Sequence, residues 1–148
     1  QPEKRLFSLS DLLHNLEELL QTNFQENNIS FTLWCSPEPM MTEGDEKQLS
    51  QVFLNLLKNA MQALEGHPHG ELSLQAEQDE YIVIDITDNG PGIPPEIMDK
   101  VFIPFFTTKS EGTGIGLSLC KEIIRRHEGH LAIKESRAGK TVFHIELP

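Results

Sequence analysis

The sequence predicts a single α+β domain whose β-sheet buries one face and leaves the other in solvent. Apolar and polar residues alternate at 29–35, 72–76 and 82–86, which is the period of strands with one buried side. Two longer segments, near 10–26 and 45–64, instead repeat their apolar residues at helical spacing. With 148 residues, the chain is long enough for one domain with a substantial core.

The first part of the chain predicts a short edge strand followed by a helix. Residues 4–9 form the expected strand, and Ser10 is the expected N-cap of the helix. The apolar face of this helix is expected to contain Leu12, Leu13, Leu16, Leu19, Leu20 and Phe24. Asn27 and Asn28 end the helix before the next strand begins.

The helix near 45–64 carries a stripe of amides beside its apolar face. Asp45 followed by Gln48 resembles a capping box at its start. The apolar face comprises Leu49, Val52, Phe53, Leu56, Leu57, Ala60, Ala63 and Leu64. Asn55 and Asn59 lie one turn apart next to it, although Asn is a poor residue for a helix interior. Two interpretations stand open, a solvated polar edge or a ligand-facing pair, since an amide oxygen can coordinate Mg²⁺ without adding charge.

Asp88 stands where the strand at 82–86 gives way to Asn-Gly-Pro-Gly. The preceding strand holds this carboxylate rigidly, and Gly90 and Gly92 let the backbone approach a flat or bulky ligand. A carboxylate in that place can accept hydrogen bonds from a ligand amine. The alternative is a tight turn with a solvated Asp.

The last third of the chain predicts two helices and a closing hairpin. A short helix is expected to begin at Pro94-Pro95 and run to about Val101. A second helix follows a glycine-rich segment and has Gly129 as its expected C′ residue. Residues 131–136 and 141–147 then form the expected hairpin.

The glycine-rich segment before the second of these helices suits a phosphate group. Gly112, Gly114 and Gly116 lie at the mouth of the helix, where free N–H groups and the helix dipole both favour an anion. A dinucleotide motif is excluded because Leu117 stands where its third glycine is required. The segment alone is weakly specific.

Composition limits the classes of partner. The formal net charge of −11 and the pI of about 4.9 argue against nucleic acid or an anionic membrane surface. Cys35 and Cys120 lie in apolar segments without CxxC spacing, which indicates reduced thiols in a cytoplasmic domain. Neither a signal peptide nor an apolar run near 18 residues is present. Because the chain begins at Gln1 without Met, we expect it to be part of a larger protein.

The chain contains four sequence blocks in a fixed order, at residues 51–64, 88–93, 101–109 and 111–117. Together they resemble the ATP-binding domain of sensor histidine kinases, whose fold is shared with gyrase, a mismatch-repair ATPase and a heat-shock chaperone. Each block is weakly specific by itself, whereas four in this order are strongly specific. The segment 106–114 is similar in sequence to kinases of nitrogen-regulation type, and it reads Phe-Thr-Thr-Lys-Ser-Glu-Gly-Thr-Gly.

The resemblance implies a two-layer α/β sandwich with a mixed, mostly antiparallel sheet and helices on one face. It implies that Asp88 binds the adenine amino group, that Asn59 holds Mg²⁺ and that residues 102–113 form a lid. Asn55, Asn59 and Lys109 are the expected catalytic residues. The expected nucleotide contacts are Asn55, Lys58, Asn59, Asp88, Gly90, Gly92, Ile93, Phe102, Thr108, Lys109, Gly112, Thr113, Gly114, Ile115, Gly116 and Leu117.

The implied activity is binding of Mg·ATP and transfer of its γ-phosphoryl group to a histidine. The acceptor is expected on a separate dimerisation domain of the same kinase, with a response regulator as an indirect partner, because no histidine here has the family's acceptor pattern. The domain itself is expected to be a cytoplasmic monomer, and membrane anchoring of the full-length protein stays open. Two alternatives are an ATP hydrolase of the gyrase type and an inactive nucleotide-binding or docking module.

Overall fold

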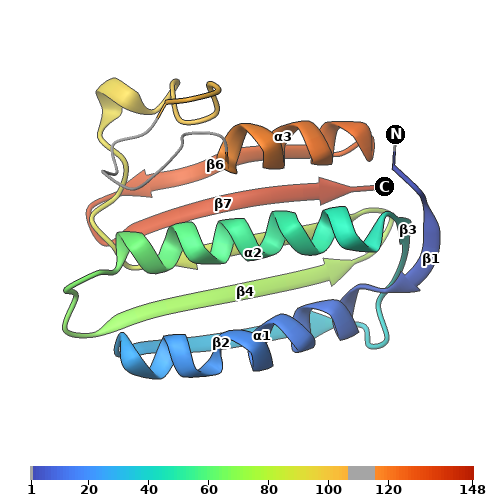
Figure 1. Cartoon of the computed structure of the whole chain (residues 1–148), viewed down its shortest axis with the longest axis horizontal. Coiled ribbons are helices and arrows are strands. Elements are labelled where there is room, and N and C mark those ends of the chain that lie inside the picture. Colours follow the sequence, from blue (N-terminus) through green and yellow to red (C-terminus); the bar gives the residue numbers. More distant parts are fainter. Residues whose placement is uncertain (1, 107–115) are drawn as a thin grey trace.

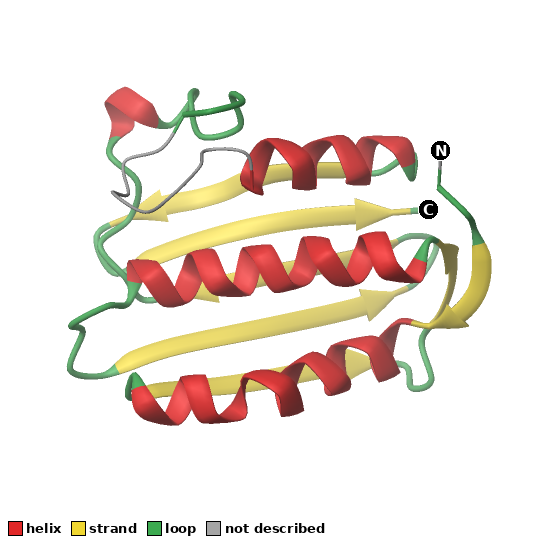
Figure 2. Ribbon diagram, in the orientation of Figure 1, coloured by secondary structure: helices red, strands yellow, loops and turns green. Residues whose placement is uncertain are grey.

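Three helices cover one face of a five-stranded sheet in the computed structural model, which describes residues 2–106 and 116–148 (Figures 1 and 2). In spatial order the sheet consists of β2 (Ile29–Ser36), β4 (Gly70–Gln78), β5 (Ile82–Asp88), β7 (Lys140–Leu147) and β6 (His130–Arg137). Only β2 and β4 are parallel, and the other pairs are antiparallel. The helices are α1 (Leu9–Glu26), α2 (Glu46–Ala63) and α3 (Gly116–Arg126). The predicted α+β sandwich with a mixed sheet is confirmed.

Helix α1 begins two residues earlier than the sequence predicts. The side chain of Ser8 accepts a hydrogen bond from the Asp11 N–H and is the N-cap, so the assignment of Ser10 is wrong. Ser10 is buried, and its hydroxyl accepts the Met40 N–H at 2.9 Å, which joins the first turn to the chain before β3. Leu19, expected on the buried face, is 64% exposed, whereas the other five predicted apolar residues are buried.

The predicted edge strand is present as β1 (Arg5–Ser8), but it pairs outside the main sheet. Its antiparallel partner is β3 (Met41–Gly44), a strand that the sequence does not predict. This two-stranded sheet lies at the end of the molecule that holds both chain termini (Figure 1).

The start of helix α2 confirms half of the predicted capping box. The Asp45 side chain accepts the Gln48 N–H at 3.2 Å. The Gln48 side chain does not return a hydrogen bond, and its oxygen is buried without a partner among the residues described. The predicted apolar face is buried except at Ala63, which is exposed at the last turn.

Helix α3 ends in a Schellman motif that is displaced by one residue from the prediction. Glu128, with φ of 63°, is the C′ residue, and its N–H bonds to the Arg125 carbonyl. Gly129 follows as C″ and donates to the Ile124 carbonyl at 2.9 Å. Glycine is required at 129 because a Cβ there would lie 2.3 Å from the Glu146 carbonyl oxygen of β7.

The short helix predicted from Pro94 to Val101 is only the 3-10 turn η1 (Pro95–Ile97). Proline does occupy its first turn, as expected, but none of its residues is buried, so no apolar face holds a longer helix. Among residues 2–106 and 116–148, no helix is both long and apolar enough to cross a membrane.

Candidate functional site

Asp88 is the last residue of β5 and lies on the helix-covered side of the sheet. It is 4% exposed, and its Oδ1 accepts the Gly90 N–H at 2.9 Å. Burial raises the pKa of this carboxyl, although the Gly90 N–H partly opposes that shift. The residues described provide no cation for it. The expected rigid carboxylate at a strand end is therefore present, and it is buried, so the alternative of a solvated turn Asp is excluded.

The loop after Asp88 is fastened to β4 through Asn89. The Asn89 side chain accepts the Glu71 N–H at 2.7 Å and donates to the His69 carbonyl at 2.9 Å. Its backbone N–H donates to the Glu71 carbonyl. These bonds continue the sheet one residue beyond β5 and fix the direction in which the loop leaves.

Gly92 occupies a position that excludes a side chain, and a side chain at Gly90 would require its neighbours to shift. A Cβ at Gly90 would lie 2.9 Å from Asp88 Oδ1 and 3.1 Å from the carbonyl oxygen of Ala63, the last residue of α2. Gly92 has φ of +85°, and a Cβ there would lie 2.6 Å from the Arg137 carbonyl oxygen. The loop therefore passes tightly between the end of α2 and the β6–β7 turn.

Helix α2 ends beside the Asp88 loop and carries the two predicted amides, Asn55 at its middle and Asn59 one turn before its last residue. Asn55 and Asn59 are both half-buried, and Ala63, one turn beyond Asn59, touches the loop at Gly90. In α3, burial raises the pKa of the Cys120 thiol to about 11, and the nearby Asn55 side chain acts to lower it. The thiol itself donates to the Val52 carbonyl at 3.7 Å. Lys58 is exposed on a neighbouring face. Both amides are thus partly buried, which argues against a fully solvated polar edge.

Phe102 is anchored at the start of the segment that leads away from the site. Its ring packs edge-on against Phe143 of β7, with centroids 6.3 Å apart, and Lys121 Nζ lies 4.4 Å above it. Where the described part of the chain resumes, Gly116 begins α3 and Leu117 packs against the core. The remaining predicted contacts lie outside the residues described, namely Thr108, Lys109, Gly112, Thr113, Gly114 and Ile115, as does most of the predicted lid.

The sequence did not single out Thr141 as a neighbour of Asp88. Thr141 lies directly opposite Asp88 in the β5–β7 pairing, and it is also 4% exposed. Two buried polar side chains therefore share one cross-strand position on the helix-covered face. The only sequence signal was a Thr at an inward position of an otherwise apolar strand.

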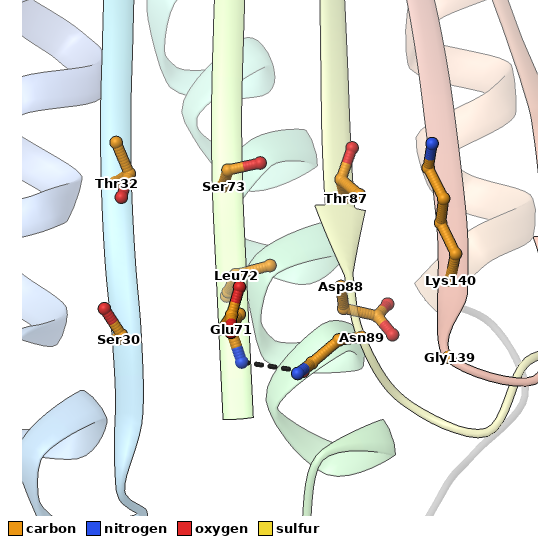
Figure 3. A pocket seen from close by; sticks show the side chains of 10 residues that line it. All are labelled: Ser30, Thr32, Glu71, Leu72, Ser73, Thr87, Asp88, Asn89, Gly139 and Lys140. Carbon is orange, nitrogen blue, oxygen red and sulfur yellow. Dashed lines mark hydrogen bonds between the residues drawn. The ribbon is translucent and has the colours of Figure 1, made fainter. Parts of the chain in front are cut away.

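A pocket of about 270 Å³ lies on the opposite face of the sheet. Figure 3 shows its lining, which includes four hydroxyl side chains from neighbouring strands, namely Ser30, Thr32, Ser73 and Thr87. Asp88 and Gly139 border it at one end, but the Asp88 carboxylate is buried toward the helices. We therefore place the candidate site on the helix-covered side.

Comparison with known proteins agrees with this arrangement. Residues 44–148 match the family described as histidine kinase-, DNA gyrase B- and HSP90-like ATPase. The chain is 38% identical over 144 residues to sporulation kinase C of Bacillus subtilis, covering 95% of this chain and 33% of that protein. It is 34% identical to the sensory histidine kinase/phosphatase NtrB of Rhodobacter capsulatus, covering 99% of this chain and 44% of NtrB.

Solved structures show the same fold. The catalytic domain of histidine kinase ThkA, in a nucleotide-free form, superposes with a TM-score of 0.89 at 32% identity, covering 99% of this chain and 95% of that one. ThkA in complex with the response regulator protein TrrA matches with a TM-score of 0.83 at 30% identity, covering 99% of this chain and 42% of that one. The chain spans a third to less than half of the curated relatives described above. It belongs to the histidine kinase-, gyrase B- and HSP90-like ATPase family, and within that family it is a catalytic domain of the sensor histidine kinase type.

Proposed function

We propose that this domain binds Mg·ATP at the end of β5 and transfers the γ-phosphoryl group to a histidine on a separate dimerisation domain of the same kinase. The observation that carries the proposal is the Asp88 carboxylate, which is 4% exposed. Within the residues described, its hydrogen-bond partner is a single backbone N–H. Burying a carboxylate without a cation costs free energy, and such groups concentrate at functional sites. An adenine amino group supplies the missing donor.

The metal ion is proposed to bind through Asn59. No group of three His, Cys, Asp or Glu side chains within residues 2–106 and 116–148 is arranged to hold a metal. An amide oxygen is a suitable ligand for Mg²⁺, which commonly keeps water and phosphate oxygens as its other ligands. When bound, the ion offsets the charge of the triphosphate, which matters in a chain of net charge −11.

Asn55 favours phosphoryl transfer over hydrolysis. A neutral amide cannot accept a proton from water, so Asn55 cannot act as the general base that hydrolysis requires. An imidazole can attack the γ-phosphoryl group without prior loss of a proton, so a kinase needs no general base at this place. Lys58 and Lys109 are proposed to contact the phosphates, with Gly112, Gly114 and Gly116 around them.

The proposed partner is the histidine-bearing dimerisation domain, with a response regulator receiving the phosphoryl group afterwards. The absence of the family's acceptor pattern around each of the six histidines supports a substrate on another domain. Cys35 and Cys120 are both free thiols, which is consistent with a reducing compartment. We propose that the domain is cytoplasmic, monomeric by itself, and active only when the acceptor is placed in line with the γ-phosphate.

Phosphoryl transfer and hydrolysis can be measured side by side. With labelled Mg·ATP, the domain should leave its own histidines unlabelled and should label a helical hairpin taken from the full-length kinase. Phosphate release should stay far below about 1 s⁻¹, the low end of ordinary turnover numbers. Fast phosphate release without labelling of the hairpin would instead support an ATP hydrolase, and no nucleotide binding would support a docking module.

The metal assignment has a matched control on the same helix. Asn59→Ala should abolish the Mg²⁺ dependence of ATP binding and the labelling of the hairpin. Gln62→Ala removes an amide that is exposed near the end of α2, and it should change neither property. Equal behaviour of the two variants would contradict the role given to Asn59.

A further inference from the structure

A bulge in β6 turns Ser136 toward the site. In the pairing of β6 with β7, the register shifts by one residue at Lys134, which reverses the alternation of faces beyond it. Ser136 therefore lies opposite Thr141, and Thr141 lies opposite Asp88. Directly opposed residues of adjacent strands share a face. The three residues form a polar row on the side of the sheet that the helices cover.

The end of β6 and the β6–β7 turn hold the loop that follows Asp88 at three points. The Ser136 hydroxyl accepts the Ile93 N–H at 2.7 Å, across 43 residues of sequence. The Gly139 N–H donates to the Gly90 carbonyl at 2.8 Å. Between these two bonds, Gly92 packs so closely on the Arg137 carbonyl that a Cβ would lie 2.6 Å from its oxygen. Of the three contacts, only the one at Ser136 depends on a side chain.

We propose that Ser136 is a positioning residue for the adenine end of the nucleotide site. By holding Ile93 it keeps the loop in the arrangement in which the Gly90 N–H donates to the Asp88 carboxylate and Gly92 packs on the Arg137 carbonyl. A loop ordered before the ligand arrives does not have to be ordered during binding, which increases affinity. This inference rests on the proposed function, and it adds a residue that lies outside all four sequence blocks.

The test compares three variants by calorimetry at a temperature where all are folded. Ser136→Ala removes the acceptor and should weaken binding of ATP and ADP by the same factor, about 3- to 10-fold, as expected for one net hydrogen bond. Ser136→Thr keeps the hydroxyl and should restore affinity to within about twofold of the parent. Ser30→Ala, on an exposed position of β2 without a side-chain hydrogen bond among the residues described, is the matched control and should leave affinity unchanged.

Amide hydrogen exchange separates positioning from a purely structural role. If Ser136 positions the loop, Ser136→Ala should speed exchange of the Gly90 N–H, which bonds to Asp88 and not to Ser136. A lower melting temperature with unchanged affinity and unchanged exchange at Gly90 would overturn the proposal. Asp88→Asn, measured in parallel, tests the adenine site at Asp88 separately from the positioning role of Ser136. If only Asp88→Asn weakens ATP binding, Ser136 is not a positioning residue; if neither does, the proposed adenine site is wrong as well.

Discussion

Two aspartates at opposite ends of helix α2, Asp45 and Asp88, have different environments and different pKa shifts. Asp45 caps the first turn, and its carboxylate accepts the N–H groups of Gln48 and Glu3. The bond from Glu3 is the main reason that the pKa of Asp45 is lowered. Asp88 lies beyond the last turn, where burial raises its pKa and one N–H is its partner among the residues described. The fold therefore stabilises the ionised carboxylate of Asp45, whereas burial of the ionised Asp88 carboxylate costs free energy of folding.

The residues around Asp45 are well packed and hydrogen-bonded, whereas those that follow Asp88 are more exposed. At the Asp45 end, the buried His127 accepts the Asp45 N–H through Nε2 and contacts the Ile123 carbonyl through Nδ1, so α2 and α3 are joined through satisfied groups. At the Asp88 end, the chain continues into a segment in which Phe105 is 78% exposed. We infer that one end of α2 holds the fold together and that the other keeps unmatched polar groups for a ligand.

The largest expected effects come from alanine substitution of one glycine at each end. Gly129→Ala places a Cβ 2.3 Å from a β7 carbonyl oxygen, and Gly92→Ala places one 2.6 Å from the Arg137 carbonyl oxygen. Both should lower the free energy of unfolding by about 3 kcal/mol, since backbone has to move. Only Gly92→Ala should also weaken ATP binding, by at least about 10-fold, when affinity is measured on the folded protein.

Gly66→Ala is the control for backbone strain alone. Gly66 has φ of +76°, and no atom of the residues described lies within 4 Å of the place that a Cβ would take. The cost should therefore be limited to about 1 kcal/mol. Denaturant titration gives the stabilities, and calorimetry gives the affinities. Loss of ATP binding in Gly129→Ala would show that the two ends are not separable.

The next effect concerns the choice of base. Asp88→Asn replaces an acceptor with a possible donor facing the adenine amine, and it should weaken ATP binding by about 1–3 kcal/mol. GTP, which lacks that amine, should bind the parent domain poorly. Asp85→Asn, three residues earlier on the outer face of β5, is the matched control and should leave the affinity for ATP unchanged. If GTP binds as well as ATP, the assigned role of Asp88 is wrong.

Local signals in the sequence predicted most elements of the fold because they depend on period and capping. The helices and the strands of the main sheet follow from apolar spacing, and Asp45 was correctly identified as a cap. The strand β3 was not predicted because Met-Thr-Glu-Gly shows no alternation of apolar residues and its partner β1 is distant in sequence. The cap of α1 was misplaced because Ser8 and Ser10 both suit an N-cap, and only the bond from Met40 shows what Ser10 does.

The sequence predicts those residues of the candidate site that lie in one segment, but not those that are brought to it by strand register. Asp88 follows from a strand that runs into a glycine turn. Thr141 and Ser136 join it only through cross-strand pairing, and a single bulge decides that Ser136 faces inward. A one-residue shift of this kind leaves no periodic signal in an eight-residue strand.

The two aspartates should give opposite pH dependences of stability. Asp45 has a lowered pKa, so it stabilises the fold above its ordinary value of 3.8 and this contribution is lost as pH falls. Asp88 has a raised pKa, so the fold carries no penalty below 3.8 and acquires one as pH rises through the raised value. At neutral pH, Asp88→Asn should raise stability by about 1 kcal/mol and Asp45→Asn should lower it by less. Both differences should vanish near pH 2 in denaturant titrations, and differences of equal sign at neutral pH would remove the contrast.

The smallest expected effect belongs to His144, which lies on the outer face of the sheet at neither end of α2. Partial burial acts to lower the pKa of His144, but hydrogen bonds to Glu146 at 2.9 Å and Asp85 at 2.6 Å outweigh it and raise the pKa. Lys134 also contacts Asp85, at 3.3 Å, and weakens the attraction. Because the folded pKa exceeds the ordinary value of 6.5, the stabilisation is complete below pH 6.5 and is lost as pH rises through the folded value.

The loss of stability should be a few tenths to about 1 kcal/mol, since the pair is partly solvated. His144→Gln should abolish this step in the stability profile between about pH 6 and pH 8 while leaving ATP affinity unchanged. A change in ATP affinity would mean that the outer face of the sheet is energetically coupled to the nucleotide site. The structural and binding roles of the two ends of α2 would then not be fully separate.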